Sequence, residues 1–183
     1  GYLTFWTSAD NDDDDTTATE RMRVTSAGKV GIGTTSPMNR LQLSHTGANG
    51  DNGLMMVRED TSTAANDLLG GIGFDSTDGN VPSSILEASA YVAGYASEAH
   101  GTGDKGGYLT FGTSSENDDD DTTSSERMRI TDEGNVGIGT TNPKAKLDVV
   151  GTTNISERLT VGGTANLLSK LNVEGHANLR SGL

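Results

Sequence analysis

The chain has 183 residues, no cysteine and a net charge of −13; the missing cysteine excludes disulfides and thiolate chemistry, and the acidic charge argues against nucleic-acid binding through a basic face. Only 32% of the residues are hydrophobic, and Leu, Ile, Val and Phe together supply 34 of 183, about 19%; a charged chain of this composition does not fold alone. No apolar stretch approaches the roughly 20 residues of a membrane span, so we expect a protein that buries its apolar side chains against other copies of itself.

Residues 1–43 return as residues 107–149 at a constant offset, with 28 identities in 43 positions. A fixed offset of this kind identifies an internal repeat, and the repeat has the size of a small domain. We therefore expect 1–43 to be the C-terminal part of a first β module and 44–149 to be a complete second module. The first residue, Gly1, agrees with a piece of a longer protein.

The segment 44–106, which precedes the second copy, predicts three strands at 54–58, 68–74 and 84–93. Loops rich in Gly, Asn, Asp, Ser and Thr separate them. Alanine content makes a helix the alternative for 84–93. A strand is favoured because Gly94 follows at once and because every second residue from Ile85 to Tyr91 falls on one face.

The second copy itself predicts β structure. Leu109 and Phe111 alternate with their neighbours, and Met128 and Ile130 alternate with two arginines, as in strands with one apolar face. A turn is expected at 132–135. The short strand that follows, at 136–139, contains two glycines that let another backbone come close.

The last 37 residues, 147–183, repeat Leu-x-Val-x-Gly-x-x-Asn-(Ile/Leu) every 12 residues. Odd positions carry 12 apolar residues in 19, whereas even positions carry two in 18. Because 12 is even, the alternation continues from repeat to repeat, which predicts a β stalk with one apolar face and excludes a helical stripe. Three chains wound together would bury that face. The predicted trimer core is Leu147, Val149, Ile155, Leu159, Val161, Leu167, Leu171, Val173 and Leu179.

Two acidic runs, 12–15 and 118–121, offer carboxylates of the kind that calcium binds. The candidate ligands are Asp13, Asp15, Asp119 and Asp121. A solvated hairpin loop is the favoured interpretation, because the spaced Asp-x-Asp-x-Asp-Gly loop is absent. The sequence Gly-Gly-x-Gly-x-Asp at 70–75 occurs once, whereas calcium-binding β-rolls stack many copies. No cofactor is expected.

No combination of residues has the spacing of a catalytic site. The glycines at 31–33 and 137–139 lack the Gly-Lys-Ser/Thr ending of a phosphate loop. The three histidines, His45, His100 and His176, lie far apart without cysteine, which disfavours a metal site. We therefore expect a protein without enzymatic activity.

Receptor contact would need aromatic side chains on projecting loops. The candidates are Tyr91, Tyr95 and His100, which lie in a stretch rich in Gly and Ala. The alternative for the two tyrosines is that they pack the core of their own module.

The phrase Arg-Met-Arg-Ile…Gly-x-Val-Gly-Ile-Gly-Thr-Thr-x-Pro…Leu-x-Val-x-Gly, over 127–151, resembles one found in bacteriophage tail-fibre proteins. The first copy, at 20–43, carries it too, and the 12-residue array is similar to the β shafts of the same proteins. In those fibres the phrase often precedes a self-cleaving chaperone, whose serine–lysine pair is not in this sequence.

The resemblance implies an elongated, intertwined homotrimeric fibre of all-β class, in which β modules are joined to a triple-stranded stalk. It implies a shaft in the virion tail that supports attachment to a host-cell receptor, glycan or protein, through other regions. The alternative is a trimeric fibre or adhesin of the bacterial cell surface. A polysaccharide-degrading tailspike is a weaker alternative, since one Trp and four Tyr supply few sugar-binding platforms.

Overall fold

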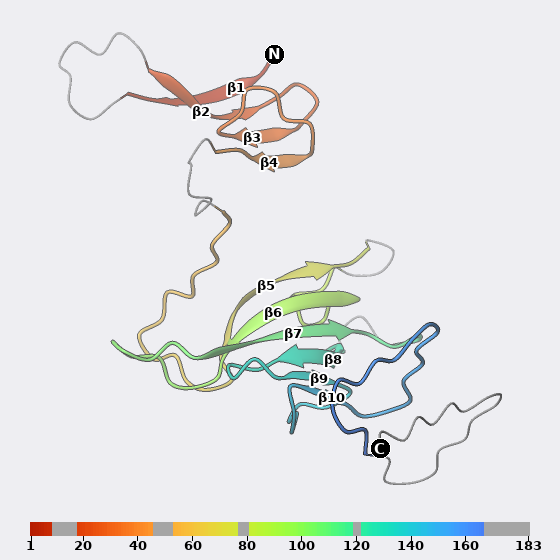
Figure 1. Cartoon of the computed structure of the whole chain (residues 1–183). Coiled ribbons are helices and arrows are strands. Elements are labelled where there is room, and N and C mark those ends of the chain that lie inside the picture. Colours follow the sequence, from red (N-terminus) through yellow and green to blue (C-terminus); the bar gives the residue numbers. More distant parts are fainter. Residues whose placement is uncertain (9–17, 46–52, 77–80, 119–121, 167–183) are drawn as a thin grey trace. The chain divides into compact units, whose positions relative to one another are not determined.

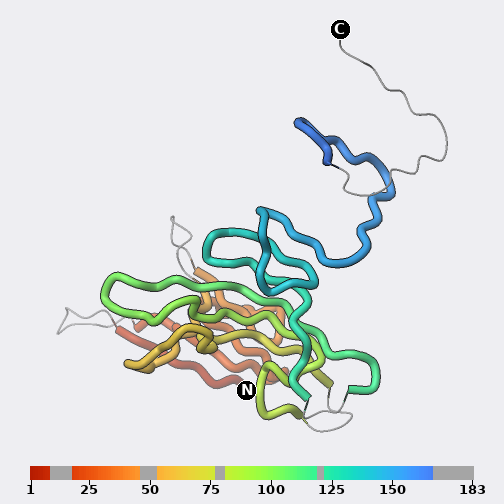
Figure 2. Tube along the Cα trace, turned by 90° about the horizontal axis from the view of Figure 1, so that it is seen from below, coloured from red at the N-terminus to blue at the C-terminus, as the bar shows by residue number. Residues whose placement is uncertain are grey.

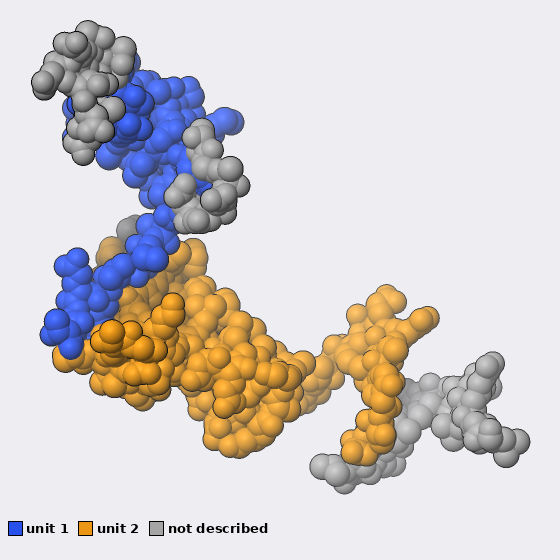
Figure 3. Space-filling view, turned by 60° about the vertical axis from the view of Figure 1, so that its left-hand side comes forward, with its two compact units in different colours: residues 1–61 blue, residues 62–183 orange. Residues whose placement is uncertain are grey.

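The computed structural model describes residues 1–8, 18–45, 53–76, 81–118 and 122–166. In these residues the chain is all-β, without a helix, and therefore without a helix that could cross a membrane. It divides into two compact units, residues 1–61 and 62–183 (Figure 3). The strands are β1 (Leu3–Thr7), β2 (Thr19–Val24), β3 (Val30–Ile32), β4 (Leu41–Leu43), β5 (Leu68–Phe74), β6 (Ala90–Ala96), β7 (Gly107–Thr113), β8 (Ser125–Ile130), β9 (Val136–Ile138) and β10 (Leu147–Val149) (Figure 1).

Each unit contains one sheet in which the strands follow their order in the chain. Unit 1 has the order β1-β2-β3-β4, and unit 2 has β10-β9-β8-β7-β6-β5. Neighbouring strands are antiparallel except for the last pair of each sheet, β3–β4 and β9–β10, which are parallel. Each sheet is therefore an antiparallel meander that ends in one parallel strand.

The sequence duplication is reproduced strand by strand. At the offset of the repeat, β2, β3 and β4 have the same bounds as β8, β9 and β10. The cross-strand register is also the same: Phe5 pairs with Met22 as Phe111 pairs with Met128, and each hairpin has a register shift at the next residue. Such bulges bend a strand locally. The duplicated sequence therefore specifies one four-stranded unit, and β5 and β6 are added to its β7 edge in unit 2.

The parallel pair in each copy is joined by a tight connection, 139–146 in unit 2, although parallel strands usually need a crossover of about a dozen residues or more (Figure 2). Gly139 starts it at φ 69°, a left-handed conformation that favours glycine. A Cβ at Gly137 would lie 2.5 Å from the carbonyl oxygen of Thr140, so the returning chain needs the missing side chain. The expectation that these glycines admit close backbone approach is confirmed.

Two of the three strands predicted before the second copy need correction. The strand at 68–74 is confirmed as β5, but 54–58 forms no strand, and its four apolar side chains are exposed. The strand predicted at 84–93 starts only at Ala90. Residues 83–89 form turns instead, since Glu87 accepts hydrogen bonds from the Ser83 hydroxyl (2.9 Å) and the Ser84 N–H (3.2 Å).

The stalk predicted for 147–183 begins as strand β10, but residues 150–166 contain no strand in a single chain. The backbone bends at Gly151, at 156–157 and at 162–163, so glycine marks two of the three bends. Every residue from 150 to 166 is exposed. A strand needs a hydrogen-bonded neighbour. The Val150 N–H still donates to the Ile138 carbonyl at 2.9 Å, but no described strand pairs with 151–166.

Candidate oligomerisation surface

One face of the second sheet is apolar across all six strands. Side chains alternate between the two faces of a strand, so the paired register defines rows that cross the sheet on one face. The first row is Ile72, Val92, Phe111, Met128, Ile138 and Val149, and the second is Gly70, Gly94, Leu109, Ile130, Val136 and Leu147. We call these rows the apolar face. They contain neither a charged nor a polar side chain.

Unit 1 carries the same two rows on its four strands. They are Phe5, Met22, Ile32 and Leu43, and Leu3, Val24, Val30 and Leu41. Again every residue is apolar. The apolar face is therefore a property of the repeat and is not confined to one of its copies.

The apolar face is open in both units. None of its side chains is buried, and among the described residues no segment packs over it. Ile32 and its equivalent Ile138 both keep 41% of their surface exposed. Exposed apolar patches of this extent are rare on monomeric proteins and mark sites of association.

The opposite face of the second sheet is packed from within the unit. Tyr91 is only 5% exposed, and Ala93 and Thr110 are buried beside it. The turns at 83–89 cover the β5 end of this face, where Ala88 is buried against Gly73 and Ile85 lies against Gly71. The buried residues Ala88, Tyr91, Ala93 and Thr110 therefore lie on one side of the sheet; Ala96, at the end of β6, is also buried and has the parity of the rows, whereas the rows themselves contain no buried side chain.

A stack of charged and aromatic groups closes the packed face. The Arg129 guanidinium lies 4.4 Å from the ring centroid of Tyr108, and this ring stacks on Tyr95 at 5.2 Å. Glu126 accepts two hydrogen bonds from Arg129, at 2.7 and 2.8 Å. Burial, with the neighbouring Tyr91 as the next cause, raises the pKa of Tyr95 to about 12.

Half of this stack is repeated in unit 1. Arg23 donates two hydrogen bonds of 2.6 Å to Glu20 and lies 4.6 Å from the ring centroid of Tyr2. The hydrogen bond with Arg23 lowers the pKa of Glu20, and the same bond raises the pKa of Arg23. Tyr2, however, is exposed and has no second ring stacked on it in the described residues.

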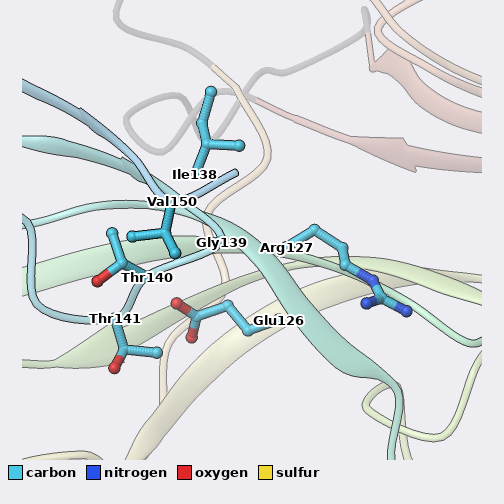
Figure 4. Close-up of a pocket in the computed structure, with 7 residues that line it drawn as sticks. All are labelled: Glu126, Arg127, Ile138, Gly139, Thr140, Thr141 and Val150. Atoms are coloured by element: carbon cyan, nitrogen blue, oxygen red, sulfur yellow. The ribbon is translucent and has the colours of Figure 1, made fainter. Parts of the chain in front are cut away.

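A surface hollow of about 680 Å³ lies where the β8, β9 and β10 segments meet. In Figure 4 the Glu126 carboxylate points towards Thr140 and Thr141, whereas the Arg127 side chain points away. Both charges already have partners: Glu126 binds Arg129, and Arg127 donates to the Thr113 hydroxyl at 3.1 Å. The hollow brings together no acid–base pair with a proton to transfer.

The structure describes five of the nine residues predicted for the trimer core. Leu147 and Val149 belong to the two apolar rows, and Ile155, Leu159 and Val161 are exposed in the segment that follows. The other four, Leu167, Leu171, Val173 and Leu179, lie outside the described residues. The rows and the start of the stalk thus share two residues and form one series of apolar side chains, none of which is buried.

The receptor-contact candidates have other surroundings. Tyr91 lies in the core and Tyr95 stacks on Tyr108, which supports the packing alternative for both. The His100 ring nitrogen Nε2 lies 3.0 Å from the carbonyl oxygen of Gly106 and closes the loop before β7. Of the other two histidines, His45 is exposed and His176 lies outside the described residues.

The calcium candidates Asp13, Asp15, Asp119 and Asp121 all lie outside the described residues. The hairpin expected around the second run is present, since β7 and β8 pair antiparallel on either side of it. Asp118, at its start, accepts a 2.6 Å hydrogen bond from the N–H of Ser115. Asp75, in the β-roll-like sequence, accepts hydrogen bonds from Ser89, so its role here is to hold the turn.

Sequence reasoning placed the association surface in the stalk and did not assign the rows of the two sheets to it. Residues such as Ile32, Leu43, Leu109 and Ile138 were therefore not named as interface candidates. The available signal was the apolar alternation in the strands of both copies. The sequence does not show the pairing register of the strands, and only this register aligns the short apolar segments into rows.

No family model matches the chain, and no curated protein is significantly similar to it.

Proposed function

We propose that the chain is a structural shaft segment of a homotrimeric fibre, the tail fibre of a bacteriophage, which supports attachment to the host cell. The observation that carries the proposal is the apolar face, which occurs in both units, is open in both and leads through β10 into the 12-residue repeats.

The partner that best fits the apolar face is another copy of the same chain. Both units present nearly the same side chains in the same register, so identical chains side by side would meet like with like at each level. Since the rows contain no charged side chain, they offer no electrostatic complementarity that would select a different protein as the partner. The apolar alternation in 147–183 gives the same partner a continuous surface to bind.

A shaft role follows from where the apolar side chains are used. If the apolar face is consumed in self-association, the outer surface holds the packed face and its charged stack, and recognition of a receptor is left to other regions. The described residues also contain no group of His, Cys, Asp and Glu arranged for a metal ion. Adding further copies of the repeat in tandem would lengthen such a rod without changing the structure of each copy.

The experiment has two parts. Analytical ultracentrifugation of the full chain should give three times the 19.0 kDa chain mass, and electron microscopy should show rods. A single-chain mass at micromolar concentration contradicts the proposal.

The second part separates a virion fibre from a cellular one. Antibodies raised against the chain should label the tails of phage particles purified from the source material. Labelling of the bacterial surface in cells that contain no phage would favour the adhesin, and release of sugar from host polysaccharide would favour the tailspike.

A further inference from the structure

The outer edge of β7 shows how this repeat completes its sheet. Strand β6 pairs antiparallel along that edge, with Tyr91 opposite Gly112, Ala93 opposite Thr110, and Tyr95 opposite Tyr108. The side chains reinforce the pairing, because the Thr110 hydroxyl donates to the Ala93 carbonyl at 3.2 Å and the two tyrosine rings stack.

The same edge of β1 is open. In the described residues no strand pairs with it on the side away from β2, and Trp6 keeps 55% of its surface exposed. The inner half of the tyrosine stack is nevertheless built there, with Arg23 over Tyr2 as Arg129 lies over Tyr108. An unpaired strand edge is a template for another strand.

One substitution between the copies decides which strand fits. At the repeat offset, Trp6 stands where unit 2 has Gly112. A Cβ at Gly112 would overlap the ring of Tyr91, so this ring requires a glycine opposite it. A side chain at position 6 therefore conflicts with a tyrosine of the pairing strand that has the conformation of Tyr91.

Trp6 also provides the aromatic ring that the pairing strand would otherwise bring. Its indole Nε1 donates to the Thr4 hydroxyl at 2.9 Å, so the ring lies back along β1 towards Thr4. In unit 2 the ring of Tyr91 lies against the equivalent residues, Thr110 and Gly112. At this position the copy in unit 1 carries a large residue, Trp6, where the copy in unit 2 carries glycine opposite a tyrosine.

We propose that the open edge of β1 binds an antiparallel strand of the β6 type, supplied by a hairpin of another module of this repeat. That strand carries a tyrosine opposite Tyr2 and a residue no larger than alanine opposite Trp6. The hairpin at 62–106 is excluded, from this chain or from a second copy, because its Tyr91 would meet Trp6. Trp6 is thus a specificity residue that keeps each hairpin on its own sheet, and this inference does not depend on the proposed fibre.

The test adds a second copy of residues 62–106 in front of Gly1 of the full chain. The junction keeps the natural sequence, since Gly1-Tyr-Leu-Thr-Phe5 is identical to Gly107-Tyr-Leu-Thr-Phe111. Four versions combine the added hairpin, unchanged or with Tyr91→Ala, with position 6, unchanged or Trp6→Gly. Hydrogen exchange of residues 1–7 reports pairing. Emission from Trp6, the sole tryptophan, reports its burial in the two versions that retain it.

The Tyr91→Ala hairpin should slow exchange in residues 1–7 roughly tenfold or more and shift Trp6 emission to the blue. With Trp6 in place, the unchanged hairpin should neither slow exchange nor shift the emission. Once Trp6→Gly is introduced, the unchanged hairpin should protect residues 1–7, because this combination has the same residue pairs as unit 2. Equal protection by the unchanged hairpin on the unaltered chain overturns the proposal, and so does a failure of both matched combinations. Protection of β1 in the chain without any added hairpin, together with a doubled mass, would assign the edge to β1 of a second copy and also overturn it.

Discussion

Ile32 and Ile138 offer a paired test of the apolar face, because they occupy equivalent positions with the same 41% exposure. Covering a whole isoleucine side chain contributes about 1.5–3 kcal/mol, so covering the remaining two-fifths contributes roughly 0.6–1.2 kcal/mol per chain. Over three chains, Ile138→Ala should therefore weaken assembly by roughly 2–4 kcal/mol, or about 30- to 1,000-fold in the association constant.

Ile138→Asp should act more strongly, since three carboxylates would be brought together in an apolar interface, each losing its water. The assay is sedimentation equilibrium over a series of concentrations. Ile32→Ala and Ile32→Asp serve as internal repeats in unit 1. Met38→Asp is the control, because Met38 is more exposed, at 78%, yet lies in a connection outside the rows. If Met38→Asp dissociates the assembly as strongly as Ile138→Asp, or if neither isoleucine matters, the apolar face is not the interface.

Three further predictions concern single features of the fold. Gly139→Ala should lower the free energy of unfolding by about 1–2 kcal/mol or more in urea, because φ is 69° and the new Cβ would lie 2.7 Å from the Val150 carbonyl oxygen. The control Gly162→Ala, whose Cβ would meet no atom within 4 Å, should change the free energy of unfolding by less than about 0.5 kcal/mol. The pKa of Tyr95 is raised from 10.0 to about 12, so folding favours the neutral phenol. The stabilisation that this shift contributes is complete below pH 10 and is lost as the pH rises from 10 to 12. In Tyr95→Phe the urea concentration at the unfolding midpoint should therefore fall less steeply with pH between 10 and 12. An unchanged midpoint slope in Tyr95→Phe would refute this assignment. Millimolar calcium should leave the melting temperature where chelator leaves it, and a rise of many degrees would assign an ion site to the aspartate runs at 12–15 and 118–121.

The strands of the duplicated copies were predictable because their apolar residues alternate. Met128 and Ile130 fall on one face with arginines between them, and β8 has that arrangement. The strand predicted at 54–58 was wrong for a physical reason: its apolar residues are consecutive, without alternation, and no described strand pairs with them. Apolar composition alone does not provide a hydrogen-bonded neighbour.

The candidate site was predictable only in part. Leu147 and Val149 were named from the periodicity of the stalk, whereas the rest of the rows depends on register, which relates residues as distant as Ile72 and Val149. Register is set by bulges and turn geometry, and a shift of one residue exchanges the faces of a strand. The exchange of Trp6 for Gly112 is visible in the alignment of the copies, but its meaning appears only when Tyr91 is placed opposite.

The open apolar face also sets a problem for the newly made chain. If the chain assembles as proposed, two sheets present uncovered hydrophobic rows to every neighbouring polypeptide before the partner chains bind, the condition under which aggregation competes with correct assembly. A net charge of −13 counters this competition, since chains that repel one another at a distance associate only where short-range contact is extensive and in register. In the proposed assembly the acidic composition would thus act on kinetics: it would slow every encounter between chains, and only the encounter that matches the rows over their full length would persist.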